Sequence, residues 1–144
     1  MQGALTDPNQ LAQVISHAMG PAFLLSAVAS FVAILIGRMN GIMDRIRNLN
    51  MIADDDGPRA RLKSDIPRLK RRARLLNTAI YLAVASALST TLLVILAFAS
   101  AFVGVRHEPV AGVLFMVALG LLGCALFTLG REVRIGLNEF DHYG

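Results

Sequence analysis

The chain has little charge, and three long stretches of it have none. Charged residues make up 17% of its 144 residues. The charge-free stretches run from Ala18 to Gly37, from Leu75 to Val105 and from Pro109 to Gly130, with lengths of 20, 31 and 22 residues. About 20 apolar residues in a helix cross the roughly 30 Å hydrocarbon core of a bilayer. Three such helices would leave a soluble protein of this length too little polar surface to cover them, which argues against a soluble domain.

Several residue types and motifs are also missing, and their absence excludes particular kinds of chemical site. The single cysteine, Cys124, excludes a disulfide framework within the chain. The first 20 residues contain no Lys or Arg, so the positive region of a cleaved signal peptide is missing. No nucleophile–base motif, phosphate loop, metal-binding helix or haem attachment sequence is present. No Asp, Glu, Lys, Arg or His lies in the middle of an apolar stretch, where a proton relay would need one. We therefore expect no enzyme activity, no cofactor and no metal site.

The apolar stretches predict an all-α integral membrane bundle of three transmembrane helices. They lack the period-two alternation of a lipid-facing strand, and a helix is the other way to satisfy backbone polar groups in lipid. We expect an outer interfacial segment (1–20), membrane helices (21–37, 75–105 and 109–130), an outer loop (106–108) and a cytoplasmic tail (131–144). The remaining segment, 38–74, is expected to form a basic cytoplasmic helical hairpin between the first two membrane helices.

The basic residues indicate the orientation. Of the 14 Lys and Arg residues, 11 lie between Arg38 and Arg74, and none precedes the first helix. Arg131 and Arg134 follow the third helix directly. Because Lys and Arg near helix ends favour the cytoplasmic side, the long loop and the C-terminal tail are predicted inside and the N-terminus outside. Three crossings require the loop and the tail to share a side, and they do.

Local signals suggest where the helices begin and end. Thr6 or Asp7 is expected to cap a helix that has Pro8 in its first turn. A break or kink is expected at Gly20-Pro21, after that short interfacial helix; the alternative is a frayed N-terminal extension of the first membrane helix. The third membrane helix is expected to end near Gly130, with a short cytoplasmic helix after it.

The predicted hairpin shows coiled-coil-like spacing on both of its sides. The apolar positions are Ile42, Ile46 and Leu49 on the outgoing side and Ile66, Leu69, Ala73 and Leu76 on the returning side. The basic residues predicted to contact anionic lipid or a partner are Arg38, Arg45, Arg47, Lys70, Arg71, Arg72 and Arg74. The alternative is that these residues only determine topology and form a solvated face. Nucleic-acid binding is not expected, because no aromatic residues are interleaved for base stacking.

Two further patterns lie within the membrane helices. Small residues line faces that allow close helix approach, namely Ala22, Ser26, Ser30, Ala33 and Gly37 on the first helix and Gly112, Gly120 and Gly123 on the third. They predict either packing within the monomer or self-association. Hydroxyl groups on the second helix, Ser86, Ser89, Thr90 and Ser100, could line a pore between copies. The alternative is that they bond carbonyls of their own or a neighbouring helix.

The run from Arg38 to Leu49 resembles a family of small bacterial membrane proteins of unknown function. In that family an apolar first helix ends in an arginine, followed by an Asp-Arg-x-Arg-x-Leu run, a basic loop and two more membrane helices. Asp44, Arg45, Arg47 and Leu49 carry the motif here, and the resemblance extends from about Leu11 to Arg134. It implies a bacterial inner-membrane location and no assigned activity.

The leading functional hypothesis is a homo-oligomeric inner-membrane protein with a structural, accessory or scaffold role. Its basic hairpin would contact anionic lipid or a partner. One alternative is a small oligomeric ion channel lined by the hydroxyl face of the second helix. Another is an accessory subunit of a larger membrane complex.

Overall fold

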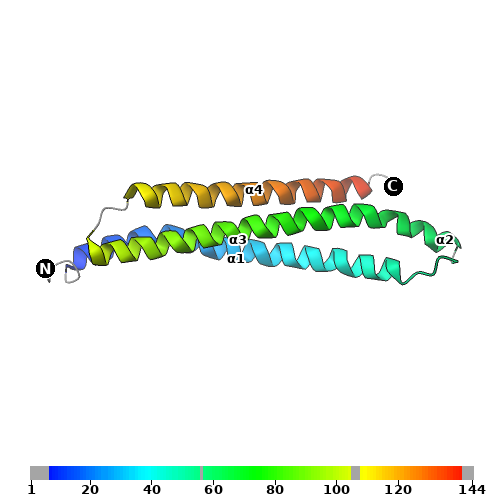
Figure 1. Ribbon diagram of the computed structural model, residues 1–144, viewed down its shortest axis with the longest axis horizontal. Coiled ribbons are helices and arrows are strands. Elements are labelled where there is room, and N and C mark those ends of the chain that lie inside the picture. The colour runs from blue at the N-terminus through cyan, green and yellow to red at the C-terminus, as the bar shows by residue number, and fades with distance from the viewer. Residues whose placement is uncertain (1–6, 56, 105–107, 141–144) are drawn as a thin grey trace. The chain divides into compact units, whose positions relative to one another are not determined.

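The computed structural model shows an all-helical chain (Figure 1). It describes residues 7–55, 57–104 and 108–140. The elements are α1 (Pro8–Asn50), α2 (Gly57–Ala60), the 3-10 helix η1 (Arg61–Asp65), α3 (Ile66–Val103) and α4 (Glu108–Phe140). The three long helices α1, α3 and α4 are each long and apolar enough to cross a membrane. These features confirm the all-α prediction and suggest a multi-pass membrane protein.

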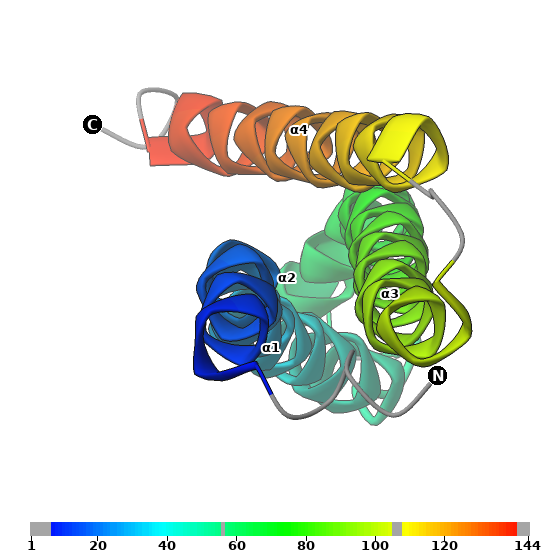
Figure 2. The ribbon, with the colours of Figure 1, turned by 90° about the vertical axis from the view of Figure 1, so that its left-hand side faces the viewer.

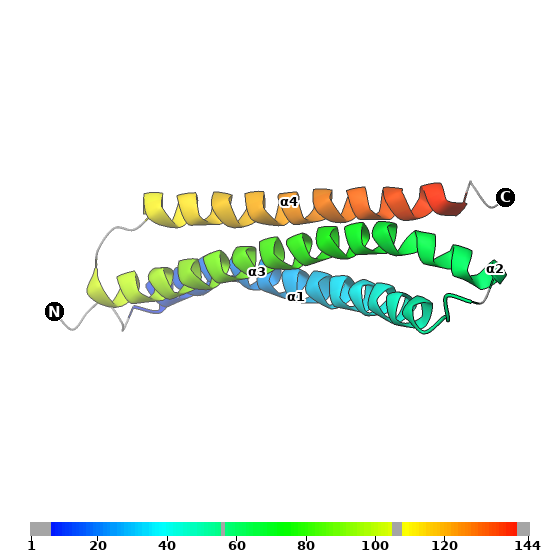
Figure 3. The same ribbon diagram turned by 45° about the vertical axis from the view of Figure 1, so that its right-hand side comes forward.

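The chain forms two compact units. Unit 1 comprises Met1–Phe31 and Leu82–Gly123, and unit 2 comprises Val32–Tyr81 and Cys124–Gly144. In unit 1, the C-terminal part of α3 lies against the N-terminal part of α4 (Figure 2). In unit 2, the C-terminal part of α1 lies beside the N-terminal part of α3 (Figure 3).

Helix α1 begins as its capping residue predicts and then continues further than expected. The Asn9 N–H donates to Asp7 Oδ1 at 3.1 Å, so Asp7 is the cap; the alternative cap, Thr6, lies outside the described residues. Of the predicted break or kink at Gly20-Pro21, the break is wrong, because α1 is one helix with Pro21 in its interior; the kink stays a prediction. Proline removes a single N–H donor, and a long helix in an apolar setting can tolerate that loss. The alternative reading, an extension of the first membrane helix, is confirmed.

Helix α3 ends at Val103, two residues before the predicted end at Val105. Gly104 has a φ of +71°, and it is the one described residue with a positive φ. Its N–H donates to the Ser100 carbonyl oxygen at 2.8 Å. A left-handed glycine after the last helical residue is a common helix stop, and this one ends α3.

We expect Gly104→Ala to lower the free energy of unfolding by about 1 kcal/mol, because a Cβ disfavours the left-handed conformation. Thermal unfolding in detergent, followed by circular dichroism, would measure this change. Gly130→Ala is the matched control, since a Cβ there meets nothing within 4 Å. The control should be stabilising by about 0.5–1 kcal/mol. Equal effects at the two glycines would contradict the role of Gly104 as a stop.

Helix α4 is continuous from Glu108 to Phe140, so the predicted end near Gly130 and the separate cytoplasmic helix after it are wrong. A glycine in a helix interior costs only about 1 kcal/mol relative to alanine. Glu132, described below, lies just beyond Gly130 and joins this part of α4 to α1 and α3. The predicted outer loop falls mainly on residues 106 and 107, which lie outside the described residues.

Buried positions along the helices repeat every seven residues. On α3 the two series are Leu69, Leu76, Ala83 and Thr90, and Ala79, Ser86 and Leu93. On α1 the series is Val28, Leu35, Ile42 and Leu49, and on α4 it is Ala118, Ala125 and Glu132. A repeat of seven keeps one seam of each helix facing its neighbours. The apolar spacing predicted around residues 42–49 and 66–76 is confirmed at Ile42, Ile46, Leu49, Leu69 and Leu76, while Ile66 and Ala73 are half-buried.

Candidate functional site

The most unusual group in unit 2 is the carboxylate of Glu132, whose side chain is 0% exposed. Arg38 of α1 donates to Glu132 Oε2 from Nη2 at 2.7 Å and from Nε at 3.0 Å. Arg72 of α3 donates to Oε1 from Nε at 2.9 Å. A buried carboxylate is costly unless it is paired and hydrogen-bonded, and here both oxygens are satisfied. We call Arg38, Arg72 and Glu132 the ionic triad.

The ionic triad occupies core positions of the seven-residue pattern. Glu132 follows the buried Ala125 by seven residues. Arg38 follows the buried Phe31 by seven, and Arg72 precedes the buried Ala79 by seven. Polar residues at such positions specify how helices align, at some cost in stability. The triad therefore aligns segments of α1, α3 and α4 within unit 2.

A glycine on α4 makes room for one of the two guanidinium groups. A Cβ added at Gly136 would lie 3.0 Å from Arg72 Nη2 and 3.3 Å from its Cζ. Gly136 is one helical turn beyond Glu132, on the same side of α4. The absence of a side chain at Gly136 therefore lets Arg72 lie against α4 while it reaches Glu132.

A second, weaker charged layer lies seven residues from the ionic triad. Arg45 follows Arg38 by seven residues, and the buried Asp65 precedes Arg72 by seven. Arg45 Nη2 and Asp65 Oδ2 are 4.0 Å apart, which is an ion-pair distance but too long for a hydrogen bond. This ion pair connects α1 to the end of η1, and Asp65 accepts no hydrogen bond from the Arg45 guanidinium.

Two other ion pairs of unit 2 are exposed. Asp44 pairs with Arg47 one turn later at 3.6 Å. Lys63 pairs with Asp54 at the turn after α1. The hydrogen bond from Lys63, and then its charge, lower the pKa of Asp54 below its usual value. Exposed pairs of this kind add little stability.

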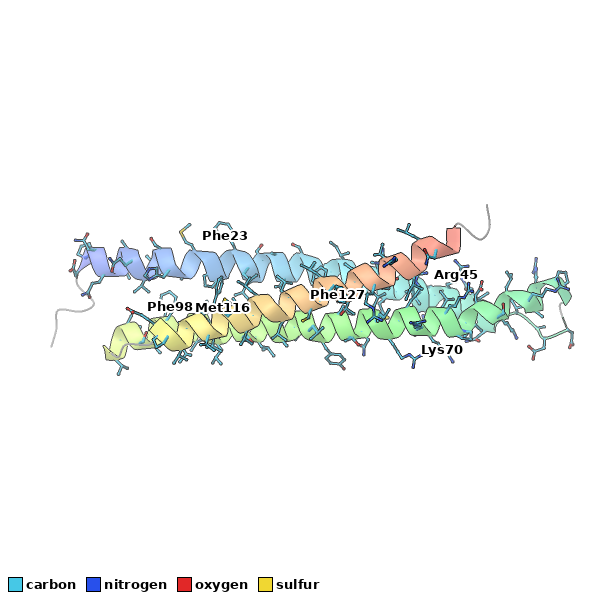
Figure 4. The ribbon with its side chains drawn as sticks, turned by 90° about the horizontal axis from the view of Figure 1, so that it is seen from above. Phe23, Arg45, Lys70, Phe98, Met116 and Phe127 are labelled. Atoms are coloured by element: carbon cyan, nitrogen blue, oxygen red, sulfur yellow. The ribbon has the colours of Figure 1, made fainter. Side chains whose placement is uncertain are left out.

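The structure divides the predicted lipid-contact residues into two sets. Arg38 and Arg72 belong to the ionic triad, and Arg45 faces Asp65. The other set is exposed and consists of Arg47, Lys70, Arg71 and Arg74; Lys70 is labelled in Figure 4. Arg45 is exposed as well, so the basic outer surface comprises this second set together with Arg45.

The small residues predicted for helix packing are exposed. This holds for Ala22, Ser26, Ser30, Ala33 and Gly37 on α1 and for Gly112, Gly120 and Gly123 on α4. A Cβ added at any of these four glycines would meet nothing within 4 Å. The helices pack instead through the seven-residue series. Within residues 7–55, 57–104 and 108–140, these small residues are therefore not seen to pack, and self-association stays a prediction.

The predicted pore hydroxyls are bonded to backbone carbonyls. Ser86 is fully buried and donates to the Ala118 carbonyl oxygen of α4 at 2.7 Å. Thr90, also fully buried, donates to the Ser86 carbonyl oxygen at 2.9 Å. Ser89 and Ser100 bond the carbonyls of Ala85 and Ala97, and both are half-buried. The alternative reading of these hydroxyls, as internal hydrogen-bond donors, is confirmed.

Unit 1 has a cavity of about 430 Å³ between α1, the end of α3 and the start of α4. Aromatic rings of Phe98 and Phe102 and polar groups of Gln10, His17 and Glu108 are among its lining. The described residues hold no group of three or more His, Cys, Asp or Glu side chains that could bind a metal ion.

Sequence reasoning missed Glu132, because the third helix was expected to end near Gly130. The residues beyond Gly130 are predicted to form a tail, in which Arg131 and Arg134 indicate the cytoplasmic side. The available signal was the spacing of Ala118, Ala125 and Glu132, which is seven at both steps. A core position occupied by an acid predicts a basic partner in the same layer.

Comparisons with known proteins identify a family and no function. A family model described as "Protein of unknown function (DUF2721)" matches residues 18–142, which is most of the chain. No curated protein and no solved structure matches the chain.

Proposed function

Because the chain belongs to the DUF2721 family of unknown function, we propose a function from its geometry. The protein is a homo-oligomeric scaffold or accessory component of the bacterial inner membrane. Its basic segment between α1 and α3 projects into the cytoplasm as a helical hairpin and contacts anionic lipid. The N-terminus lies outside and the C-terminus inside.

Membrane insertion is supported by the apolar surface of the helices. In the most apolar window of each long helix, at most 22% of the residues are buried. Large exposed side chains include Phe23 on α1, Phe98 on α3 and Met116 and Phe127 on α4, all labelled in Figure 4. A soluble protein rarely exposes contiguous apolar surface of this extent, whereas lipid covers it at no cost.

The observation that best supports the proposed oligomerisation is the exposure of the small-residue faces. Gly112, Gly120 and Gly123 follow one side of α4, and no side chain of the described chain approaches them. Small residues allow two helix backbones to approach closely in lipid, where packing rather than the hydrophobic effect drives association. A second copy of the chain fits this face, because the chain's own helices do not use it.

Lipid contact is supported by the order of side chains along the exposed side of α3. Lys70, Arg71 and Arg74 are exposed, and the exposed Tyr81 follows Arg74 by seven residues on the same side. Basic residues beside anionic headgroups gain about 1 kcal/mol each, and tyrosine favours the interface itself. This order supports contact between the basic set and the headgroups of the cytoplasmic leaflet.

We expect the protein released gently from its own membranes to be one homo-oligomer with anionic lipid bound, as measured by native mass spectrometry. Gly123→Leu should weaken self-association roughly tenfold, because overpacking costs about 1–3 kcal/mol. Val117→Leu is the control, since Val117 is also exposed on α4 but lies about 120° around the helix from Gly123. It should leave the oligomer intact.

Two results would redirect the proposal. A wild-type monomer without preference for anionic lipid would reject it. A stoichiometric complex with other subunits would favour the accessory-subunit alternative. An ion channel has less support than either, because Ser86 and Thr90 are buried and bonded within the chain. No enzyme activity is expected, and this stays a prediction.

A further inference from the structure

Unit 2 contains a second pocket that the proposed function does not use. It lies between the C-terminal part of α1 and the N-terminal part of α3 and has a volume of about 260 Å³. Half of its lining is arginine, and the lining residues are Arg38, Gly41, Ile42, Arg45, Leu69 and Arg72. Gly41 contributes no side chain, and Ile42 and Leu69 form the apolar part. The pocket is therefore an opening between two helices with guanidinium groups around it.

The arginines around this pocket differ in how firmly they are held. Among the described residues, Glu132 accepts hydrogen bonds from Arg38 and Arg72, whereas Asp65 reaches Arg45 only at ion-pair distance. Glu132 engages Nε and Nη2 of Arg38, so Arg38 retains its Nη1 donors. Arg45 is 4.0 Å from Asp65, and its side chain is 56% exposed. Guanidinium groups bind phosphate oxygens with paired, charge-assisted hydrogen bonds.

The pocket lies where the apolar stretches end. Arg38 directly follows the charge-free stretch 18–37, and Arg72 comes three residues before the stretch 75–105. Glu132, which joins the two, comes two residues after the stretch 109–130. If the long helices cross a bilayer, this level coincides with the phosphates of the inner leaflet.

We propose that this pocket binds a phosphate group, held chiefly by Arg45 and Arg38. The phosphate can belong to a phospholipid headgroup or to a soluble phosphate. The first source rests on the membrane placement given as the proposed function, and the second does not. The pocket would bind one phosphate group at a defined position. The exposed basic residues would only attract anions non-specifically; they are Arg47, Lys70, Arg71 and Arg74.

The test compares two arginines that are neighbours on the same helix. Arg45 lines the pocket, whereas Arg47 is 75% exposed and does not. The purified protein in nonionic detergent would be titrated with phosphatidylglycerol, and bound lipid would be counted by native mass spectrometry. We expect one tightly bound lipid per chain. Arg45→Gln should weaken it about tenfold, the loss of one charge-assisted contact, and Arg47→Gln by less than about twofold.

A second pair of variants tests the pocket without changing charge. A Cβ at Gly41 meets nothing within 4 Å, so Gly41→Leu should fold and fill the pocket. We expect it to weaken phosphatidylglycerol binding about as much as Arg45→Gln does. Asn40→Leu places the same side chain at the adjacent exposed position, outside the pocket lining, and should have no effect.

Two further ligands identify the source of the phosphate. Diacylglycerol, which lacks the phosphate, should not bind at this site. Inorganic phosphate that displaces the lipid at millimolar concentration, in an Arg45-dependent manner, would support the pocket and assign it to a soluble phosphate. Failure to displace, with the Arg45 effect intact, would support a lipid headgroup.

Equal losses in Arg45→Gln and Arg47→Gln would overturn the proposal, because they would show binding by surface charge alone. So would unchanged binding in both Arg45→Gln and Gly41→Leu. A monomeric protein that still shows Arg45-dependent binding would reject the scaffold while retaining the pocket. The two proposals therefore fail separately.

Discussion

Glu132→Gln is expected to lower the free energy of unfolding by about 3 kcal/mol, the lower end of the range for breaking a buried ion pair. The amide keeps the shape of the carboxylate and removes its charge. Arg38 and Arg72 would then face one another around a neutral group. Arg38 is 37% exposed, and water can solvate it in part, so the lower end of the range applies. Titration with a denaturing detergent, followed by circular dichroism, would measure the change.

The matched control for this variant is Asp44→Asn. Asp44 forms an exposed pair with Arg47 at 3.6 Å, and its loss should cost less than about 0.5 kcal/mol. Replacing all three triad residues with methionine should restore most of the stability, because apolar residues can substitute for a buried ionic cluster. If Glu132→Gln were as stable as Asp44→Asn, the triad would not be holding unit 2 together.

Leu76→Ala is expected to be the next most destabilising change, by about 2–4 kcal/mol, through lost packing and the cavity left behind. Leu76 is 0% exposed, and it belongs to the seven-residue series of α3 between Leu69 and Ala83. The same detergent titration would measure the loss.

Leu88→Ala provides the comparison, because Leu88 lies on the same helix and is 66% exposed. In a membrane its side chain would contact lipid both before and after unfolding. Its replacement should therefore cost less than about 0.5 kcal/mol, as expected for surface positions. Similar losses at Leu76 and Leu88 would mean that α3 is rotated relative to the structure described above, or that a second copy covers Leu88.

The existence of the long helices was predictable because it depends on local composition. Apolar stretches of 20 or more residues leave few alternatives to a helix. The ends of the helices were harder to predict. Gly104 and Gly130 are the same residue type, yet one ends α3 and the other lies inside α4. Whether a glycine stops a helix depends on contacts made beyond it, and these involve residues distant in the sequence.

The same distinction explains which site residues could be predicted. A surplus of arginine between residues 38 and 74 is a local property, and so it was visible. The division of those arginines between an outer surface and the interior depends on Glu132, which is 94 residues from Arg38 and 60 from Arg72. Counting charges by segment does not detect such a partner. The exposure of the small-residue faces likewise depends on which sides of the helices pack together.

The sequence separation within the ionic triad has a consequence for biosynthesis. Ribosomes add about 5–20 residues per second, so Glu132 follows Arg38 by about 5–19 s, given the 94 residues between them. Until then, Arg38 and Arg72 occupy core positions as like charges without the carboxylate that later joins them. A chain that ends before α4 keeps this repulsion permanently. Synthesis of α4 thus supplies the carboxylate that neutralises the repulsion between Arg38 and Arg72. An incomplete chain differs from a finished one because it retains that repulsion.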